Sequence, residues 1–232
     1  MTKKAFEEIE AFMLRCMADS AHDREHVYRV LYLALDIAET EPGTDLDVLM
    51  AACLLHDVSR PEQRADPRVD HAEAGAAKAY SFLSDLGYSP EFCARVAACI
   101  RSHRFRKSLP PETPEARILF DADKLDVCGA IGIARTLQYG GSMGAPLYLR
   151  RENGEIDEGP EAESLQSPGS NASFFWEYHF KLEKLYNRFF TARGAQLAAK
   201  RKKAAECFYE SLLSEVREAD ETGRSHIRHL PD

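Results

Sequence analysis

Apolar residues recur at steps of three and four along nearly the whole chain, and this period decides the fold class. In the first segment, for example, Phe6, Ile9, Met13 and Met17 follow one another at such steps. Side chains with this spacing line one face of an α-helix, whose period is 3.6 residues. The sequence holds no alternating apolar and polar run of useful length, which would indicate a strand. It therefore predicts an all-α fold, a bundle of helices.

Breaks in the pattern divide the 232 residues into four parts. Residues 1–140 hold a series of predicted helices, the last of which covers 116–138 and is stopped by Gly140 and Gly141. Residues 141–172 lose the period and are rich in Gly, Pro and Ser, so we expect an irregular loop or a lid. The period returns over 173–219, which predicts C-terminal helices packed on the same domain, and 220–232 form a polar tail.

Charge and cysteine usage exclude some classes of partner. The formal net charge of −8 argues against a general nucleic-acid-binding surface, which needs basic residues. No apolar run reaches the roughly 18 residues of a membrane span. The six cysteines form no C-x-x-C pair, and most lie in apolar helical runs, as reduced and buried thiols do. We therefore expect a cytoplasmic protein that binds neither nucleic acid nor membrane.

Four polar side chains lie on or beside the apolar stripes of four different predicted helices. They are His26, His56, His103 and Asp123. Buried imidazoles and carboxylates are costly unless they have partners. A satisfied core histidine or a helix cap would explain any one of them, but the same accident would have to occur on four helices. A divalent cation would satisfy them together, so the pattern indicates a metal site.

The order of these residues resembles that of the HD-domain metallohydrolase superfamily. The matching segments, which cover about the first 140 residues, are DREHVYRV, LLHDVSR, HAEAGA, IRSHRF and FDADKLDVCGAIGIAR. The segment DADKLDVCGAIGIART, followed by YGG, further resembles a small bacterial branch that includes nucleotide pyrophosphohydrolases, and the last helices are similar to that branch more loosely. The resemblance implies an HD-domain helical bundle with extra C-terminal helices.

The resemblance also implies a set of metal ligands, namely His26, His56, Asp57 and Asp123. Asp123 is preferred because the family's ligand directly precedes a Lys or Arg, here Lys124. Asp121 and Asp126 are then groups on the helix surface or behind the ligands. Two nitrogen and two carboxylate ligands fit Mn²⁺, Mg²⁺, Co²⁺ or Fe²⁺, with Zn²⁺ as a further candidate.

His71 and His103 occupy positions at which HD proteins place further histidines. By one interpretation they bind a second metal ion, and by another they bind the phosphate or donate a proton to the leaving group. The basic segment RSHRFRK surrounds His103, and positive charge beside a metal suits a phosphorylated substrate. The predicted substrate-binding residues are therefore His71, Arg104, Arg106 and Lys124. The predicted catalytic residues are Asp57, His103 and Glu62, the last as a base that orients the attacking water.

The implied function is that of a divalent-metal-dependent phosphohydrolase with a small phosphorylated substrate, in particular a nucleotide. The branch resemblance implies cleavage of a nucleoside triphosphate to monophosphate and pyrophosphate, and removal of phosphate from a monophosphate is the other form. Two alternatives from other classes remain: a di-iron oxygenase of the HD type and a non-catalytic nucleotide sensor. The oligomeric state is open, and a homodimer is among the candidates.

Overall fold

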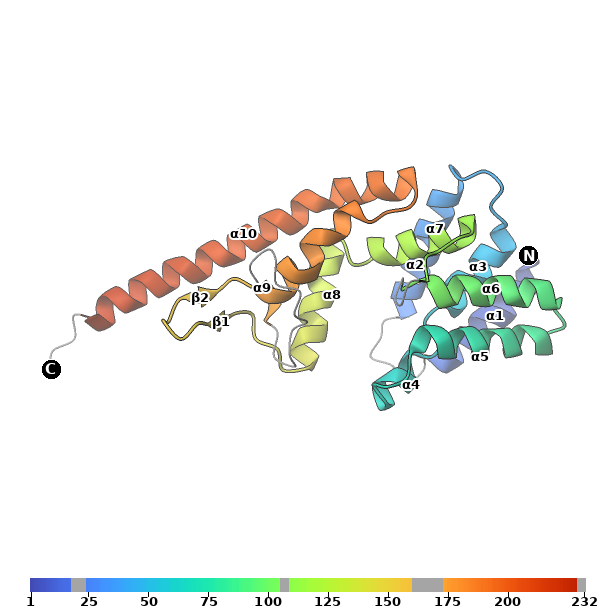
Figure 1. The fold of residues 1–232 in the computed structure, drawn as a ribbon, viewed down its shortest axis with the longest axis horizontal. Helices are drawn as coiled ribbons and strands as arrows, with labels where there is room; N and C mark the ends of the chain where they lie inside the picture. The colour runs from blue at the N-terminus through green and yellow to red at the C-terminus, as the bar shows by residue number, and fades with distance from the viewer. Residues whose placement is uncertain (18–23, 105–108, 160–172, 229–232) are drawn as a thin grey trace. The chain divides into compact units, whose positions relative to one another are not determined.

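Helices make up most of the fold, as the sequence period predicts. The computed structural model describes residues 1–17, 24–104, 109–159 and 173–228, which form two compact units. The first unit comprises residues 1–126 and 189–194, and the second comprises 127–188 and 195–232. Figure 1 shows the elements of both units. The all-α prediction is confirmed, since the sheet in the described residues is a single hairpin.

The first unit is a bundle of helices. They are α1 (Lys3–Cys16), α2 (Arg24–Ala38), α3 (Leu46–Leu55), α4 (Arg60–Ala65), α5 (His71–Asp85), α6 (Pro90–Ser102) and α7 (Pro114–Leu125). Side-chain caps begin several of them. Ser89 and Thr113, for example, accept hydrogen bonds from backbone N–H groups in the first turns of α6 and α7, and a proline follows each cap.

Helix α3 forms the centre of this bundle. Seven of its ten residues are buried, and it contacts α1, α2, α5, α6 and α7. A helix that is apolar on nearly all sides is stable only when it is surrounded by protein. Asp45 caps its first turn, and His56 is the capping residue at its other end. The apolar run therefore carries His56 and Asp57 into the interior of the bundle.

The second unit combines helices with a short hairpin. Its elements are α8 (Gly129–Ser142), β1 (Leu149–Arg150), β2 (Ile156–Asp157), α9 (Phe174–Glu177), a π-helical turn (Tyr178–Leu182), a 3₁₀ turn (Glu183–Asn187) and most of α10 (Ala192–Arg228). The strands are antiparallel, with Leu149 opposite Asp157 and Arg150 opposite Ile156. Aromatic side chains form its core. Tyr178 and Tyr209 stack with their ring centroids 4.2 Å apart, and Phe175 meets Tyr209 edge-on.

The helix predicted over 116–138 is interrupted in the structure. Helix α7 ends at Leu125, and α8 begins at Gly129, whose φ of +67° is accessible to glycine but strained for other residues. Helix α8 also runs past the predicted stop to Ser142, and the left-handed residue that follows it is Gly144. The structure accordingly assigns α8 to the second unit, whereas the sequence division includes it in residues 1–140.

Two further segments are more helical than the sequence pattern indicates. The segment after Asp57, which has two prolines, contains α4 with one of these prolines in its first turn. The predicted polar tail from residue 220 continues α10 as far as Arg228. A helix needs no apolar stripe where charged pairs one turn apart support it, and Asp220 with Arg224 is such a pair.

Candidate metal centre

Six donor side chains of the first unit converge near the ends of helices. His26 lies in the first turn of α2, and His71 is the first residue of α5. His56 and His103 cap the ends of α3 and α6, and Asp123 is in the last turn of α7. All six, including Asp57, are at most 7% exposed. The four predicted metal ligands therefore lie together with both of the additional histidines.

The six residues form two triads whose donor atoms lie within 4.8 Å of one another. We call His26, His56 and Asp123 the first triad, and Asp57, His71 and His103 the second triad. In the first triad, His26 Nε2 lies 3.3 Å from His56 Nε2 and 3.4 Å from Asp123 Oδ1.

Asp57 connects the two triads through its two carboxylate oxygens. Its Oδ2 lies 3.7 Å from both His26 Nε2 and His56 Nε2. Its Oδ1 lies 3.3 Å from His71 Nε2 and 3.8 Å from His103 Nε2. A carboxylate in this position can bridge two cations, because each oxygen faces a different pair of imidazoles.

Each imidazole is held by its Nδ1 atom, so that its Nε2 atom is directed into the centre. His56 and His103 donate from Nδ1 to the backbone oxygens of Cys53 and Ile100, at 2.8 and 2.6 Å. His26 donates to Asp126 Oδ2 at 2.7 Å, and His71 pairs with Gln63 Oε1 at 2.6 Å. Backbone and carboxylate oxygens accept, so His26, His56 and His103 carry a proton on Nδ1, and in the neutral rings of His56 and His103 the lone pair is on Nε2.

The donors fit a metal ion better than they fit one another. The Nε2 atoms of His26 and His56 lie 3.3 Å apart and both face Asp57 Oδ2, so one cation could bind all three atoms. His71 Nε2 is buried and has no hydrogen-bond partner among the described residues. Native proteins rarely leave a buried polar atom in this state, and a bound ion is a usual partner for one.

Burial and local charge favour the protonation states that bind metals. Burial lowers the pKa of His56 and His71, and it lowers that of His103 to about 3, so these rings are neutral. Burial opposes ionisation of Asp57 and Asp123, yet neighbouring charges hold both pKa values well below the ordinary range. Arg60 is the permanent cation beside Asp57, and Lys124 is the one beside Asp123. Neutral imidazoles and ionised carboxylates are the ligand forms of these side chains.

Two buried aspartates, one in α7 and one at its C-cap, have roles that the sequence left open. Asp126 accepts from His26 and from Arg29, whose Nε lies 2.7 Å from Asp126 Oδ1. Asp121 accepts from the backbone N–H groups of Phe190 and Thr191, at 2.9 and 2.7 Å, and so binds the segment before α10. Both are 0% exposed, so neither is a solvated surface acid.

The predicted substrate-binding residues surround the triads unevenly. Arg104 Nη1 lies 3.1 Å from His71 Nδ1, and Lys124 Nζ lies 2.7 Å from Asp123 Oδ2. Their side chains are 15% and 20% exposed, so they form part of the rim of the centre. Arg106 lies outside the described residues. The sequence analysis assigned no role to Arg60. Its position three residues after Asp57 could have indicated a contact, because side chains three residues apart are neighbours on a helix.

Glu62, the predicted base, pairs with a different residue. Its Oε1 lies 2.6 Å from Lys78 Nζ on α5, and Lys78 also donates to the backbone oxygen of Val58. Among the described residues, no hydrogen bond joins Glu62 to either triad. Its catalytic role therefore stays a prediction, without support from a contact.

Comparisons with known proteins agree with this geometry. The HD domain family matches residues 24–128, a range that includes all six donors. YpgQ of Bacillus subtilis is 33% identical over 152 residues, which cover 62% of this chain and 71% of YpgQ. The chain belongs to the HD superfamily. The predictions of the family and of a metal-dependent phosphohydrolase are thereby confirmed.

Crystal structures of other HD proteins resemble the whole chain. An HD-superfamily hydrolase from Bacillus thuringiensis is 27% identical, with a TM-score of 0.67 and coverage of 93% of this chain and 98% of that one. Another, from an uncultured Thermotogales bacterium, is 29% identical, with a TM-score of 0.58 and coverage of 90% and 91%. YpgQ in complex with ADP has a TM-score of 0.64 at 25% identity, with coverage of 94% and 95%.

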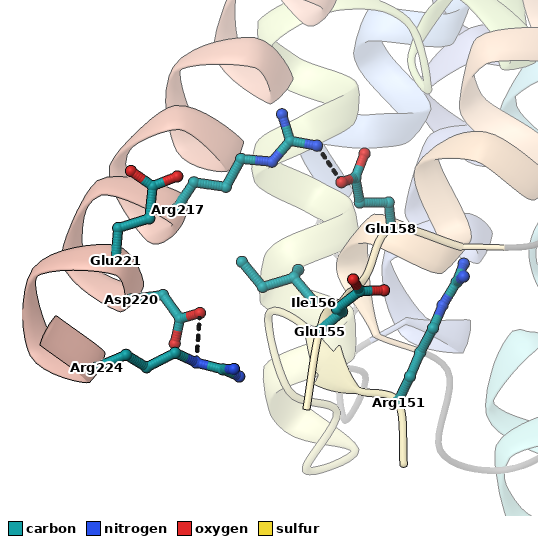
Figure 2. A pocket seen from close by; sticks show the side chains of 8 residues that line it. All are labelled: Arg151, Glu155, Ile156, Glu158, Arg217, Asp220, Glu221 and Arg224. Atoms are coloured by element: carbon teal, nitrogen blue, oxygen red, sulfur yellow. Dashed lines mark hydrogen bonds and ion pairs between the residues drawn. The ribbon is translucent and has the colours of Figure 1, made fainter. Parts of the chain in front are cut away.

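Outside the HD donors, charged side chains of the second unit line an open pocket between the hairpin and α10 (Figure 2). Most of these charges are already paired. Asp220 binds Arg150 and Arg224 at 2.6 and 3.0 Å, and Arg217 pairs with Glu158. The ion pairs in this pocket therefore attach the hairpin to the helix, and they do not form a set of unpaired donors like that of the metal centre.

None of the helices in the described part of the chain is both long and apolar enough to cross a membrane.

Proposed function

We propose that this HD enzyme hydrolyses a phosphate bond of a nucleotide at a centre of two divalent ions. The convergence of six buried donors in two triads supports this most directly. The first triad and Asp57 Oδ2 would hold one ion, and the second triad would hold the other. When bound, the ions would lower the pKa of a coordinated water and draw negative charge from the phosphoryl oxygens.

For His71 and His103 we propose the role of ligands rather than of proton donors. The Nδ1 proton of His103 is bonded to a backbone oxygen, and burial lowers the pKa of the ring to about 3. A neutral ring with this tautomer has no proton on the nitrogen that faces the centre. His71 Nδ1 contacts both Gln63 Oε1 and Arg104 Nη1, and these contacts leave its Nε2 atom for the centre. The leaving group would then take its proton from water.

We further propose that Lys124 and Arg104 neutralise the phosphate groups of the substrate. Both are cations at the partly exposed rim, next to buried donors. The complex of YpgQ with ADP supports a nucleotide with more than one phosphate. We propose cleavage of a nucleoside triphosphate to monophosphate and pyrophosphate as the first form to test, and phosphate release from a monophosphate as the second. Nitrogen and carboxylate donors without a thiolate favour Mn²⁺, Mg²⁺, Co²⁺ or Fe²⁺ over softer ions.

The direct test is a screen for release of phosphate and pyrophosphate from a panel of nucleotides, with these four metals in parallel. We expect metal-dependent turnover of at least one nucleotide, abolished by a chelator and restored by the metal. Tight nucleotide binding without turnover under every metal would contradict the proposal and would favour a sensor. A cytoplasmic location and a homodimer stay predictions.

One observation favours a second candidate function, that of a di-iron oxygenase. Four imidazoles around a bridging carboxylate would also suit two iron ions. Metal analysis of protein purified without added metal distinguishes the two. About two irons per chain, with consumption of O₂ and no release of phosphate, would favour the oxygenase.

A further inference from the structure

The two triads differ in how strongly their carboxylate oxygens are already engaged. Asp57 Oδ1, the oxygen of the second triad, accepts a hydrogen bond from Arg60 Nε at 3.0 Å. The same oxygen faces His71 Nε2 at 3.3 Å. A cation that used this oxygen would have the Arg60 guanidinium as a close neighbour of like charge.

The first triad presents oxygens that no such cation occupies. Asp123 Oδ1 faces His26, whereas Lys124 binds the other oxygen of Asp123, Oδ2. Asp57 Oδ2 also faces the first triad, while Arg60 Nε binds Oδ1. Two carboxylates thus serve the first triad, but the second triad has one, which it shares with an arginine.

A second arginine increases the positive charge at the second triad. Arg104 Nη1 lies 3.1 Å from His71 Nδ1 and 3.8 Å from Asp70 Oδ1. The side chains of Arg60 and Arg104 are partly exposed, whereas the donors beside them are buried. A phosphate group could bind both the metal ion and the arginines of this region, because its oxygens bind divalent ions and also pair with the planar guanidinium.

We propose that Arg60 couples the binding of the second metal ion to the binding of phosphate. Without phosphate, Arg60 holds Asp57 Oδ1 and opposes a cation in the second triad. With phosphate, the guanidinium turns to the phosphate oxygens, and Asp57 Oδ1 becomes a ligand. Thermodynamic linkage then requires that phosphate tighten the binding of the second metal ion, and that this ion tighten the binding of phosphate by the same factor. This inference rests on the proposed metal centre and concerns the order in which the centre is filled.

The test is a titration of the full chain with Mn²⁺, followed by calorimetry and by EPR, with and without inorganic phosphate. Blank titrations of Mn²⁺ into phosphate correct for their association in solution. For the wild type we expect one tight ion and a second, weaker ion that binds about tenfold more tightly when phosphate is present. A spin-coupled Mn²⁺ pair in the EPR spectrum identifies the second ion.

The variant Arg60→Met removes the charge and keeps most of the apolar stem. We expect it to bind the second ion about tenfold more tightly than the wild type without phosphate, and to lose the phosphate effect. Arg60→Lys, which keeps the charge, should restore the weaker second site. Arg64→Met is the matched control, because Arg64 is an exposed arginine of the same helix.

An unchanged affinity for the second ion in Arg60→Met would overturn the coupling. A wild type whose affinity for the second ion is the same with and without phosphate would also overturn it. Failure of the proposed metal centre has a different signature, since the wild type would then bind no Mn²⁺ under either condition. Thermal unfolding of each variant without metal establishes that the comparison is made on folded protein.

Discussion

The metal centre of the first unit and the pocket beside α10 are both rich in charged groups, but they use charge in opposite ways. In the metal centre the donors are buried, and six of them converge on one another from different helices. In the pocket the side chains are more exposed, and most of the charged ones are paired with a group of opposite charge. The second arrangement satisfies itself, whereas the first needs an additional cation. Paired charge is thus a sign of structure, and convergent unpaired donors are a sign of binding.

The largest expected effect is that of Asp57→Ala, because this substitution removes the oxygens that serve both triads. Because both metal positions would lose a ligand, we expect the hydrolytic rate to fall about a thousandfold or more. The measurement is the rate on the best nucleotide of the panel, with circular dichroism as a check of folding. Asp85→Ala, which changes an exposed aspartate at the end of α5, should retain the wild-type rate. Wild-type turnover by Asp57→Ala would disprove the site.

Asp126→Asn tests how a group behind the ligands acts on the centre. The amide can still accept from His26 Nδ1, but it lacks the charge that increases the basicity of the ring. We expect the affinity for Mn²⁺ to fall about 10- to 100-fold. Calorimetric titration of the folded variant measures this directly. A purely structural role would lower the unfolding temperature and leave the metal affinity of the folded protein unchanged.

Gly194→Ala tests the first turn of α10, which belongs to the first unit. An added Cβ would lie 2.6 Å from Asp121 Oδ2, so the carboxylate that binds Thr191 would have to move. We expect a loss of about 1–3 kcal/mol in the free energy of unfolding, as for other overpacked sites. Urea denaturation measures the loss. Gly223→Ala, at a position of α10 with open space around it, should instead stabilise the helix slightly.

The smallest effect is expected from Arg150→Met, which removes one of the two partners of Asp220 in the pocket beside α10. Exposed ion pairs contribute little, because water and salt screen them. We expect no measurable change in the midpoint of urea denaturation, in the affinity for Mn²⁺ or in the rate of hydrolysis. A clear loss of activity would mean that this pocket takes part in function, and the contrast between the two regions would fail.

Several features of the fold could not be predicted from the pattern of apolar residues. The apolar residues keep the helical period across the interruption between Leu125 and Gly129. The sequence pattern therefore does not reveal that the helix breaks there. The extension of α10 to Arg228 has too few apolar residues to mark a helix, and charged pairs support it instead. The all-α class was predictable, because the period of three and four recurs in every long segment.

By itself the sequence determined that polar donors share faces with buried apolar residues. His26, His56 and Asp123 could be selected for that reason and by family resemblance, because burial follows from local spacing. Only the tertiary structure decided what each donor meets. The two oxygens of Asp57 face different triads, and His26 is oriented by Asp126, 100 residues away in the chain. Such pairings depend on how distant helices pack, and no local pattern encodes the packing of one helix end against another.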